Sequence, residues 1–141
     1  MADEATLNFL KEMLGYTKAQ WETWKSNPNN LKIAENLTEI PKYRVVFEVT
    51  NSVGCAAGHK VGDQIVFDGG GCLLCNESPE KICFGLLSPI NPIAGIVLDK
   101  ICIGEDPTQM AFNNFHCVDV GVDHGGWGEV VVKAKVEKTQ E

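Results

Sequence analysis

The spacing of apolar residues changes close to Pro41. Upstream of that point, apolar residues recur at the spacing of one face of an α-helix. The clearest such stripe is formed by Leu7, Leu10 and Leu14. Gly15 follows directly and is suited to end this helix, because glycine readily adopts the left-handed conformation of a helix C-cap.

A second helix is predicted after Thr17, because Thr17–Gln20 has the Ser/Thr-x-x-Glu/Gln pattern of a capping box. It should end before Pro28, since proline interrupts a helix. A third, short helix is expected at about residues 30–37. Together these segments predict a helical arm over residues 1–41.

Downstream of Pro41, apolar and polar residues alternate, as they do in half-buried strands. The predicted strands cover residues 43–50, 64–67, 115–120 and 130–136. Residues 79–103 are too long and too apolar for a strand and predict a buried helix, broken or restarted at Ser88-Pro89. The fold class is therefore α+β: after the arm, residues 42–141 form a small, mostly antiparallel β-sheet or barrel with one inserted apolar helix.

Composition and charge narrow the possible partners. Apolar residues make up 44% of the chain, enough for a proper core, and the formal net charge is −7. Nucleic acid and anionic membrane surfaces are therefore not expected partners. The first residues lack the apolar region of a signal peptide, and the apolar segment is interrupted by glycine and proline, so a cytoplasmic, non-membrane protein is expected. In a reducing compartment, cysteines are free thiols or metal ligands more often than disulfides.

All six cysteines and all three histidines lie between Cys55 and His124. This segregation indicates one metal or redox site. The first motif within it, Gly54–Asp63, carries three glycines directly after a predicted strand, so it should be a tight loop. Cys55 and His59 are close enough in this loop to share a metal ion. The alternative is an ordinary connection between two strands.

The second motif is a C-x2-C sequence, Cys72 to Cys75, after a run of three glycines. Such a knuckle can bring two thiolates to one zinc ion. The chain has no second knuckle, so further ligands would come from other segments. A redox dithiol and plain loop cysteines are the alternatives.

The remaining candidates lie further along the chain. Cys83 stands at the start of the apolar helix, where a helix N-terminus favours the thiolate, although a small core residue is an equal alternative. Cys102, between two isoleucines, is expected in the core. His116 and Cys117 should point to opposite faces of a strand. The glycine-rich loop with His124 and Trp127 at its tip is either a pocket wall or a plain hairpin turn.

From Tyr43 to Glu137 the sequence resembles a family of small uncharacterised bacterial proteins that are frequent in anaerobes. The family motifs are a G-x-C-x-x-G-H-K-V-G-D loop, an I-C at a helix start and a C-x-D near the last strands. Here they fall on Gly54–Asp63, Ile82-Cys83 and Cys117–Asp119. The resemblance implies that Cys55, Cys83 and Cys117 belong together, with His59 beside them.

We therefore expect a small metal-binding protein, with an iron–sulfur cluster favoured over zinc, acting as an accessory subunit of a larger anaerobic enzyme. Its candidate ligands are Cys55, His59, Cys72, Cys75, Cys83 and Cys117. One alternative is a cofactor-free enzyme in which His59 activates Cys55, with Asp63 or Asp119 orienting the imidazole. Another is a small-ligand binding module in which the cysteines are incidental.

The arm raises a separate expectation about partners. Trp21 and Trp24 share one face of the second predicted helix. Two indole rings need a surface to cover, and that surface is either the chain's own sheet or barrel, or a partner subunit or second copy bound through the arm.

Overall fold

The structure, a computed structural model that describes residues 1–139, confirms the α+β class. The helices are α1 (Glu4–Leu14), α2 (Lys18–Lys25), α3 (Pro28–Glu35) and α4 (Phe84–Cys102), with short 3-10 segments η1 (Leu37–Lys42), η2 (Cys75–Glu77) and η3 (Val122–His124). The strands are β1 (Tyr43–Val53), β2 (Gln64–Asp68), β3 (Asn114–His116) and β4 (Glu129–Lys138). They form an antiparallel sheet in the order β2-β1-β4-β3. The sheet is open, with β2 and β3 at its edges, and so is not a barrel.

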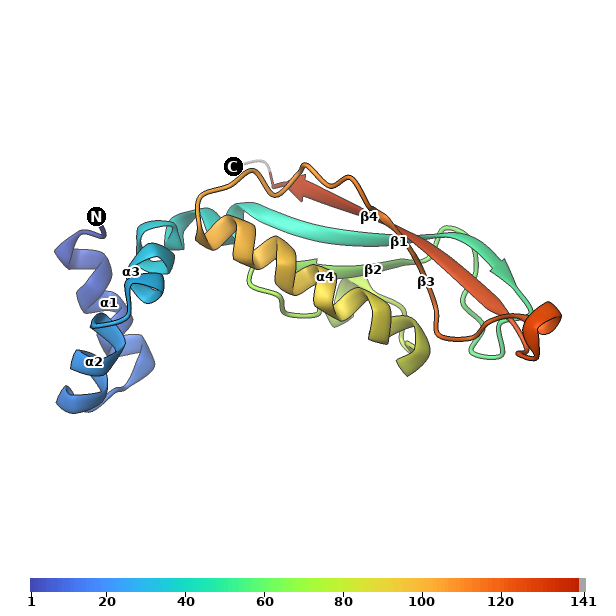
Figure 1. The fold of residues 1–141 in the computed structure, drawn as a ribbon, viewed down its shortest axis with the longest axis horizontal. Coiled ribbons are helices and arrows are strands. Elements are labelled where there is room, and N and C mark those ends of the chain that lie inside the picture. Colours follow the sequence, from blue (N-terminus) through green and yellow to red (C-terminus); the bar gives the residue numbers. More distant parts are fainter. Residues whose placement is uncertain (140–141) are drawn as a thin grey trace.

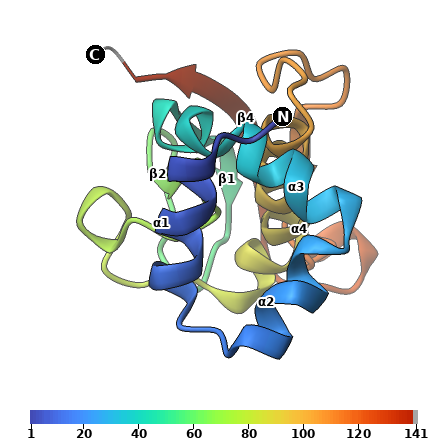
Figure 2. The same cartoon turned by 90° about the vertical axis from the view of Figure 1, so that its left-hand side faces the viewer.

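The molecule is elongated, with the helices of the arm at one end (Figure 1). The helix α4 runs along one face of the sheet and has its C-terminal end near the arm. Seen from the arm end, α1, α2 and α3 stand in front of the sheet and α4 (Figure 2). The N-terminus of α4 therefore lies toward the opposite end of the molecule.

The main core lies between α4 and one face of the sheet. Alternate residues of β1 and β4 point into it, as the period-two pattern predicts, and α4 contributes residues at helical spacing. Its fully buried members include Phe47, Ile65, Leu86, Ile90 and Val132. Because the core runs the whole length of α4, it fixes where the start of this helix meets the loops at the end of the sheet.

The prediction that the apolar helix breaks at Ser88-Pro89 is wrong, because α4 continues through Pro89. Proline lacks an N–H, so Pro89 leaves the carbonyl of Gly85 without its usual helical donor. In the structure the Val118 N–H donates to that carbonyl, at 2.9 Å. The helix thus tolerates the proline because a distant segment satisfies the freed acceptor.

The same hydrogen bond explains why β3 is shorter than the predicted strand 115–120. Pairing with β4 ends at His116. From Val118 the chain bonds to the start of α4 instead of continuing beside β4. A residue-by-residue alternation pattern carries no information about such a change of partner.

By length and composition alone, α4 is apolar enough to cross a membrane. In this fold its buried face packs on the sheet. Other residues of the same helix, Phe84 and Ile96 among them, are exposed.

The arm has a small core of its own. Leu10, Trp21 and Ala34, one from each of its helices, are buried together, and Trp24 packs at their edge. The two indole rings stack with their centroids 4.9 Å apart. Trp21 thus packs against the neighbouring helices of the arm, and neither the sheet nor a partner is needed to cover it.

The helix boundaries in the arm follow the expected capping residues. Gly15 ends α1 with a φ of 63°, and Thr17 and Gln20 form the predicted capping box of α2. The third helix begins earlier than expected, at Pro28, because proline is favoured in the first turn of a helix, where its missing N–H costs nothing.

Because the two cores are separate, Trp21→Ala should unfold the arm and leave the sheet domain folded. Truncation of a buried tryptophan side chain destabilises a fold by about 3–5 kcal/mol. The arm core has three buried side chains in all, so this loss should be enough to unfold it. Hydrogen exchange should show the amides of α1 exchanging freely while those of β1 and α4 stay protected. Phe9→Ala, on an exposed position of α1, is the matched control and should change stability by less than about 0.5 kcal/mol. Equal loss of protection in β1 would show that the two cores are one cooperative unit.

Candidate functional site

A pocket of about 310 Å³ lies at the end of the sheet that is far from the arm. Three separate parts of the chain form it: the loop after β1, the start of α4 and the segment from Cys117 that leads to β4. Its lining includes Cys55, His59, Cys83 and Cys117. The structure thus brings together four of the six candidate ligands that the sequence indicated.

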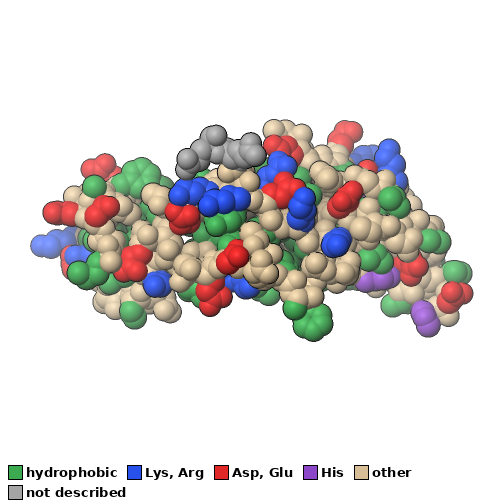
Figure 3. Space-filling view, turned by 90° about the horizontal axis from the view of Figure 1, so that it is seen from above, with side chains coloured by type: hydrophobic (Ala, Val, Ile, Leu, Met, Phe, Trp, Pro, Cys, Tyr) green, Lys and Arg blue, Asp and Glu red, His purple; other side chains and the backbone are tan. Residues whose placement is uncertain are grey.

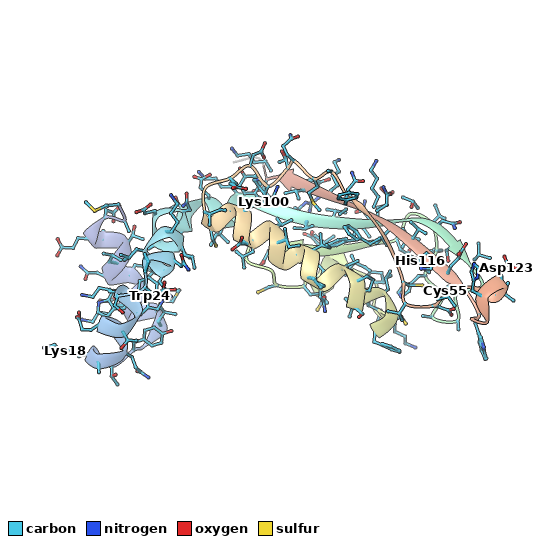
Figure 4. All side chains as sticks on the ribbon, viewed as in Figure 1. Lys18, Trp24, Cys55, Lys100, His116 and Asp123 are labelled. Carbon is cyan, nitrogen blue, oxygen red and sulfur yellow. The ribbon has the colours of Figure 1, made fainter. Side chains whose placement is uncertain are left out.

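The site lies at the end of the molecule that is remote from the arm. Cys55 and His116 lie at the end of the sheet that is remote from Trp24 in the arm (Figure 4). Histidine side chains (purple) also gather at this end of the surface, beside exposed apolar side chains (Figure 3).

Cys83 is held by two contacts at the start of α4. It is the N-cap residue, and its sulfur accepts a hydrogen bond from the Gly85 N–H at 3.4 Å. Its own N–H donates to Nε2 of His59 at 3.1 Å. His59 is 5% exposed, so this bond ties the loop after β1 to the helix start in a position that water does not reach freely.

The role of His59 differs from both roles expected from the sequence. Because its Nε2 accepts a backbone N–H, the lone pair of that nitrogen is directed at Cys83 and not at a metal ion or at Cys55. Its carbonyl oxygen accepts from the Ser52 hydroxyl at 2.6 Å. The residue therefore positions the backbone of Cys83.

Cys117 is the third thiol, and it is bound to the first residues of β4. Its N–H donates to the Val130 carbonyl at 2.9 Å, and its sulfur accepts the Val130 N–H at 3.3 Å. The thiol also donates to the Asp119 carbonyl at 3.7 Å. The neighbouring bond from Val118 to Gly85 then holds this segment against Cys83.

The pocket is closed at one side by direct contact between two backbones. A Cβ added to Gly128 would lie 2.3 Å from the Gly54 carbonyl oxygen and 2.7 Å from that of Val53. Gly54 itself has a φ of 61°, which disfavours side chains there. Only glycine at position 128 lets β4 begin this close to the end of β1.

Asp119 organises the glycine-rich loop that follows Cys117. Its carboxylate accepts from the N–H groups of Gly121, Trp127 and Gly128 at 3.0–3.1 Å. These bonds, the one from Gly128 contributing most, hold the pKa of Asp119 below its ordinary value. The carboxylate thus holds the loop together by accepting these three N–H groups, a role that the sequence did not reveal.

His116 lies on the opposite side of the strand from Cys117, as expected from alternation. Its Nδ1 contacts the Cys117 carbonyl at 2.6 Å and its Nε2 contacts Glu129 Oε2 at 3.3 Å. Both partners are acceptors, and the Cys117 carbonyl first, then the Glu129 carboxylate, raise the pKa of His116. It is therefore a partner of Glu129 and does not line the pocket. His124 lines a separate, smaller hollow beside Trp127.

Cys72 and Cys75 do not share this site. They follow β2 at Asp68, which pairs with Arg44 near the start of β1, whereas Cys55 follows the other end of β1. The strand between these ends spans roughly 30 Å at ~3.3 Å per residue. Both side chains are exposed.

The backbone between these two cysteines also lacks the turn that a metal knuckle uses. Leu73 forms an antiparallel bridge with Phe67, the Leu74 N–H donates to the Val66 carbonyl, and Leu74 is extended. This segment covers the edge of β2. The chain turns only at η2, which begins at Cys75 itself.

The sixth cysteine, Cys102, is buried in the last turn of α4, as predicted from its apolar neighbours. Burial is the main cause that raises the pKa of this thiol, and the nearby Asp99 adds to it. It contributes to packing, and its carbonyl accepts from the Asn36 side chain, which links the arm to the sheet domain.

The mouth of the pocket is apolar. Phe84 and Val118, which line it, are 81% and 54% exposed. Further exposed apolar side chains line the adjacent smaller hollow: Val53, Val120, Val122 and Trp127.

Within residues 1–139, no three His, Cys, Asp or Glu side chains are already arranged to hold a metal ion. The three pocket thiols share a cavity without being preassembled. Rotation of their side chains would be needed before they could act on one ion or one substrate.

Comparison with known proteins gave no match: no family model, no curated protein and no solved structure matches this chain. The resemblance carried by the Gly54–Asp63 loop stays a prediction.

We predict that Gly128→Ala separates the ends of β1 and β4, because every atom that the new Cβ meets belongs to backbone that cannot rotate away. Overpacking of this kind costs about 1–3 kcal/mol. Denaturant unfolding measures the loss. Gly95→Ala is the control, since a Cβ there meets nothing within 4 Å on an exposed part of α4, and it should be neutral or stabilising by up to about 1 kcal/mol. Equal stability of the two variants would contradict the close contact.

Removal of the Asp119 carboxylate should loosen its loop selectively. In Asp119→Ala three N–H groups lose their acceptor, so the amides of Gly121, Trp127 and Gly128 should exchange faster with solvent while those of β1 stay unchanged. Asp123→Ala, in the same loop but outside these bonds, is the matched control. Unchanged exchange at the three amides would show that the carboxylate does not hold the loop.

Proposed function

We propose that this protein binds a thiophilic metal centre, an iron–sulfur cluster in preference to a zinc ion, through Cys55, Cys83 and Cys117. The observation that carries the proposal is that these thiols come from three separate segments and still line one pocket. Soft thiolate ligands select zinc, copper(I) and iron–sulfur clusters.

The backbone around two of the sulfurs supports this chemistry. Cys83 and Cys117 each accept one backbone N–H, from Gly85 and Val130. Hydrogen bonds to cysteine sulfur stabilise the negative charge of a thiolate, and they tune metal–thiolate sites. The start of α4 adds its dipole at Cys83.

Metal binding would require the pocket thiols to rearrange. The Cys117 thiol donates its proton to the Asp119 carbonyl in the metal-free arrangement. A metal ion would replace this proton. Proton release on binding is expected, because cysteine binds metals as the thiolate.

The enzyme alternative has weaker support. His59 directs Nε2 at the Cys83 N–H and not at Cys55. Both proposed orienting carboxylates have other partners, since Asp63 accepts from the Lys60 N–H and Asp119 holds its loop. A small-ligand binding module is the better second candidate, because the pocket has the volume of small-molecule sites, about 300–1,000 Å³.

A role beside a larger anaerobic enzyme fits the same site. The exposed side chains of Phe84 and Val118 at the pocket mouth would be covered by a partner that uses the metal centre. A reducing cytoplasm would keep the three thiols available for metal. Docking through Trp21 and Trp24 of the arm stays a prediction, in which Trp24 would be the contact, because Trp21 is buried within the arm and Trp24 is only partly buried.

Metal analysis and absorption spectroscopy after anaerobic purification test the proposal. We expect one metal centre for each chain, and at least about a 100-fold loss of affinity in Cys55→Ser, Cys83→Ser or Cys117→Ser, since even second-shell changes cost 10–100-fold. The Cys72→Ser/Cys75→Ser double variant is the matched control and should bind metal normally. Failure of the wild-type protein to bind iron or zinc would refute the proposal, as would loss of metal only in the control.

A further inference from the structure

We infer that the pocket lined by Cys55, Cys83 and Cys117 binds an uncharged aromatic molecule of one or two rings. This inference does not depend on metal binding, because it follows from the size, the charge and the chemistry of the pocket wall alone. It names the class of organic ligand that the cavity takes through its apolar surface.

The pocket is large enough for a small ring system. Its volume is about 310 Å³, whereas an apolar cavity of about 150 Å³ can already bind benzene. Its walls are also held in place, because the Cys83 N–H donates to His59 and the Val118 N–H donates to the Gly85 carbonyl. The cavity is therefore pre-formed, as binding sites for small molecules usually are.

The polar side chains of the wall already have partners within the protein. His59 accepts the Cys83 N–H, Asp119 accepts three loop N–H groups, and Glu129 contacts His116. Within residues 1–139, no buried side-chain nitrogen or oxygen lacks a hydrogen-bond partner. A ligand with several polar groups would lose their hydration and gain few hydrogen bonds in return, so a mainly apolar ligand is favoured.

The charges of the wall disfavour charged ligands. No lysine or arginine is among the lining residues, all of which lie in the described part of the chain. The two carboxylates in the lining, Asp119 and Glu129, repel an anion. They offer little to an ammonium group, because Asp119 accepts three N–H groups and Glu129 contacts His116. An uncharged ligand therefore loses the least free energy on leaving water.

The sulfur atoms and the one aromatic side chain of the wall favour a ring over an alkyl chain. Cysteine sulfur makes favourable contacts with aromatic rings, and three of the lining residues are cysteines. Phe84 lines the same pocket and is 81% exposed, so its ring is accessible for stacking or edge-to-face contact. Aliphatic side chains such as Leu86 and Val130 complete the wall and accept either kind of ligand.

NMR titration of the metal-free protein, with a chelator and a reducing agent present, tests the inference. Three probes share one ring system and differ in charge: 1-naphthalenemethanol is neutral, 1-naphthalenemethylamine is cationic and 1-naphthoate is anionic. We expect the neutral probe to shift the amide signals of Gly85, Val118 and Val130. It should bind at least about tenfold more tightly than either charged probe, a difference of about 1.4 kcal/mol. Benzyl alcohol should likewise bind more tightly than cyclohexylmethanol.

Two variants place the ligand in this pocket. Phe84→Ala should weaken the binding of 1-naphthalenemethanol by about threefold or more, because the ring loses its aromatic neighbour. Phe112→Ala is the matched control, since Phe112 is 87% exposed and is not a lining residue, and it should change nothing. Cys55→Ala removes one proposed metal ligand but only one sulfur–aromatic contact, so it should weaken binding by less than about tenfold.

Failure of this inference is separable from failure of the proposed metal function. No shift at the three pocket amides with any probe would overturn the inference, as would shifts confined to the hollow beside Trp127. Equal or tighter binding of a charged probe would overturn the selectivity for uncharged ligands, and tighter binding of cyclohexylmethanol would overturn the selectivity for rings. None of these results bears on metal binding. A protein that binds the neutral probe and no metal would support the inference and refute only the metal function.

Discussion

The fold positions its candidate site through the start of α4, which is held by two hydrogen bonds from opposite sides. The Cys83 N–H donates to His59, and the Gly85 carbonyl accepts from Val118. The first bond joins the helix to the loop after β1, and the second joins it to the segment before β4. Without them, the start of α4 would be held against the other two cysteine-bearing segments only by the general packing of the core.

Proline makes the second of these bonds possible. In an uninterrupted helix the Gly85 carbonyl would accept the N–H of residue 89, and Val118 would have to find another acceptor. Pro89 removes that competitor, and the freed carbonyl does not stay unsatisfied because Val118 donates to it. A residue that looks like a helix breaker in the sequence is thus part of the connection between two site segments.

Periodicity was sufficient to predict the helical arm, the strands and the α+β class, because burial of one face dictates apolar spacing. It failed at Pro89 and at the end of β3, where a contact between residues distant in sequence replaces a local one. The convergence of Cys55, Cys83 and Cys117 was predicted from a motif resemblance and not from spacing. The separation of Cys72 and Cys75 from the pocket depends on strand register. The hydrogen bonds that occupy His59 and Asp119 depend on loop geometry. A pattern of residue types contains neither kind of information.

The arm and the sheet domain bury their apolar residues in different ways. The arm buries Leu10, Trp21 and Ala34 among three short helices, whereas the sheet domain uses one long helix to cover a sheet face. At the far end of that helix the packing becomes incomplete, so the pocket is hollow, its walls are apolar and its mouth is lined by exposed side chains. The thiols thus lie where the core opens to solvent, which is where a bound centre could be both protected and reached.

X-ray absorption spectroscopy of the zinc-loaded protein tests the central claim most directly, because it counts the sulfur atoms bound to the metal. The account predicts three protein sulfurs at about 2.3 Å, with one fewer in the Cys83→Ser variant and no change in the Cys72→Ser/Cys75→Ser variant. A zinc ion bound only by nitrogen and oxygen, or one whose sulfur ligands disappear with Cys72 and Cys75, would contradict it.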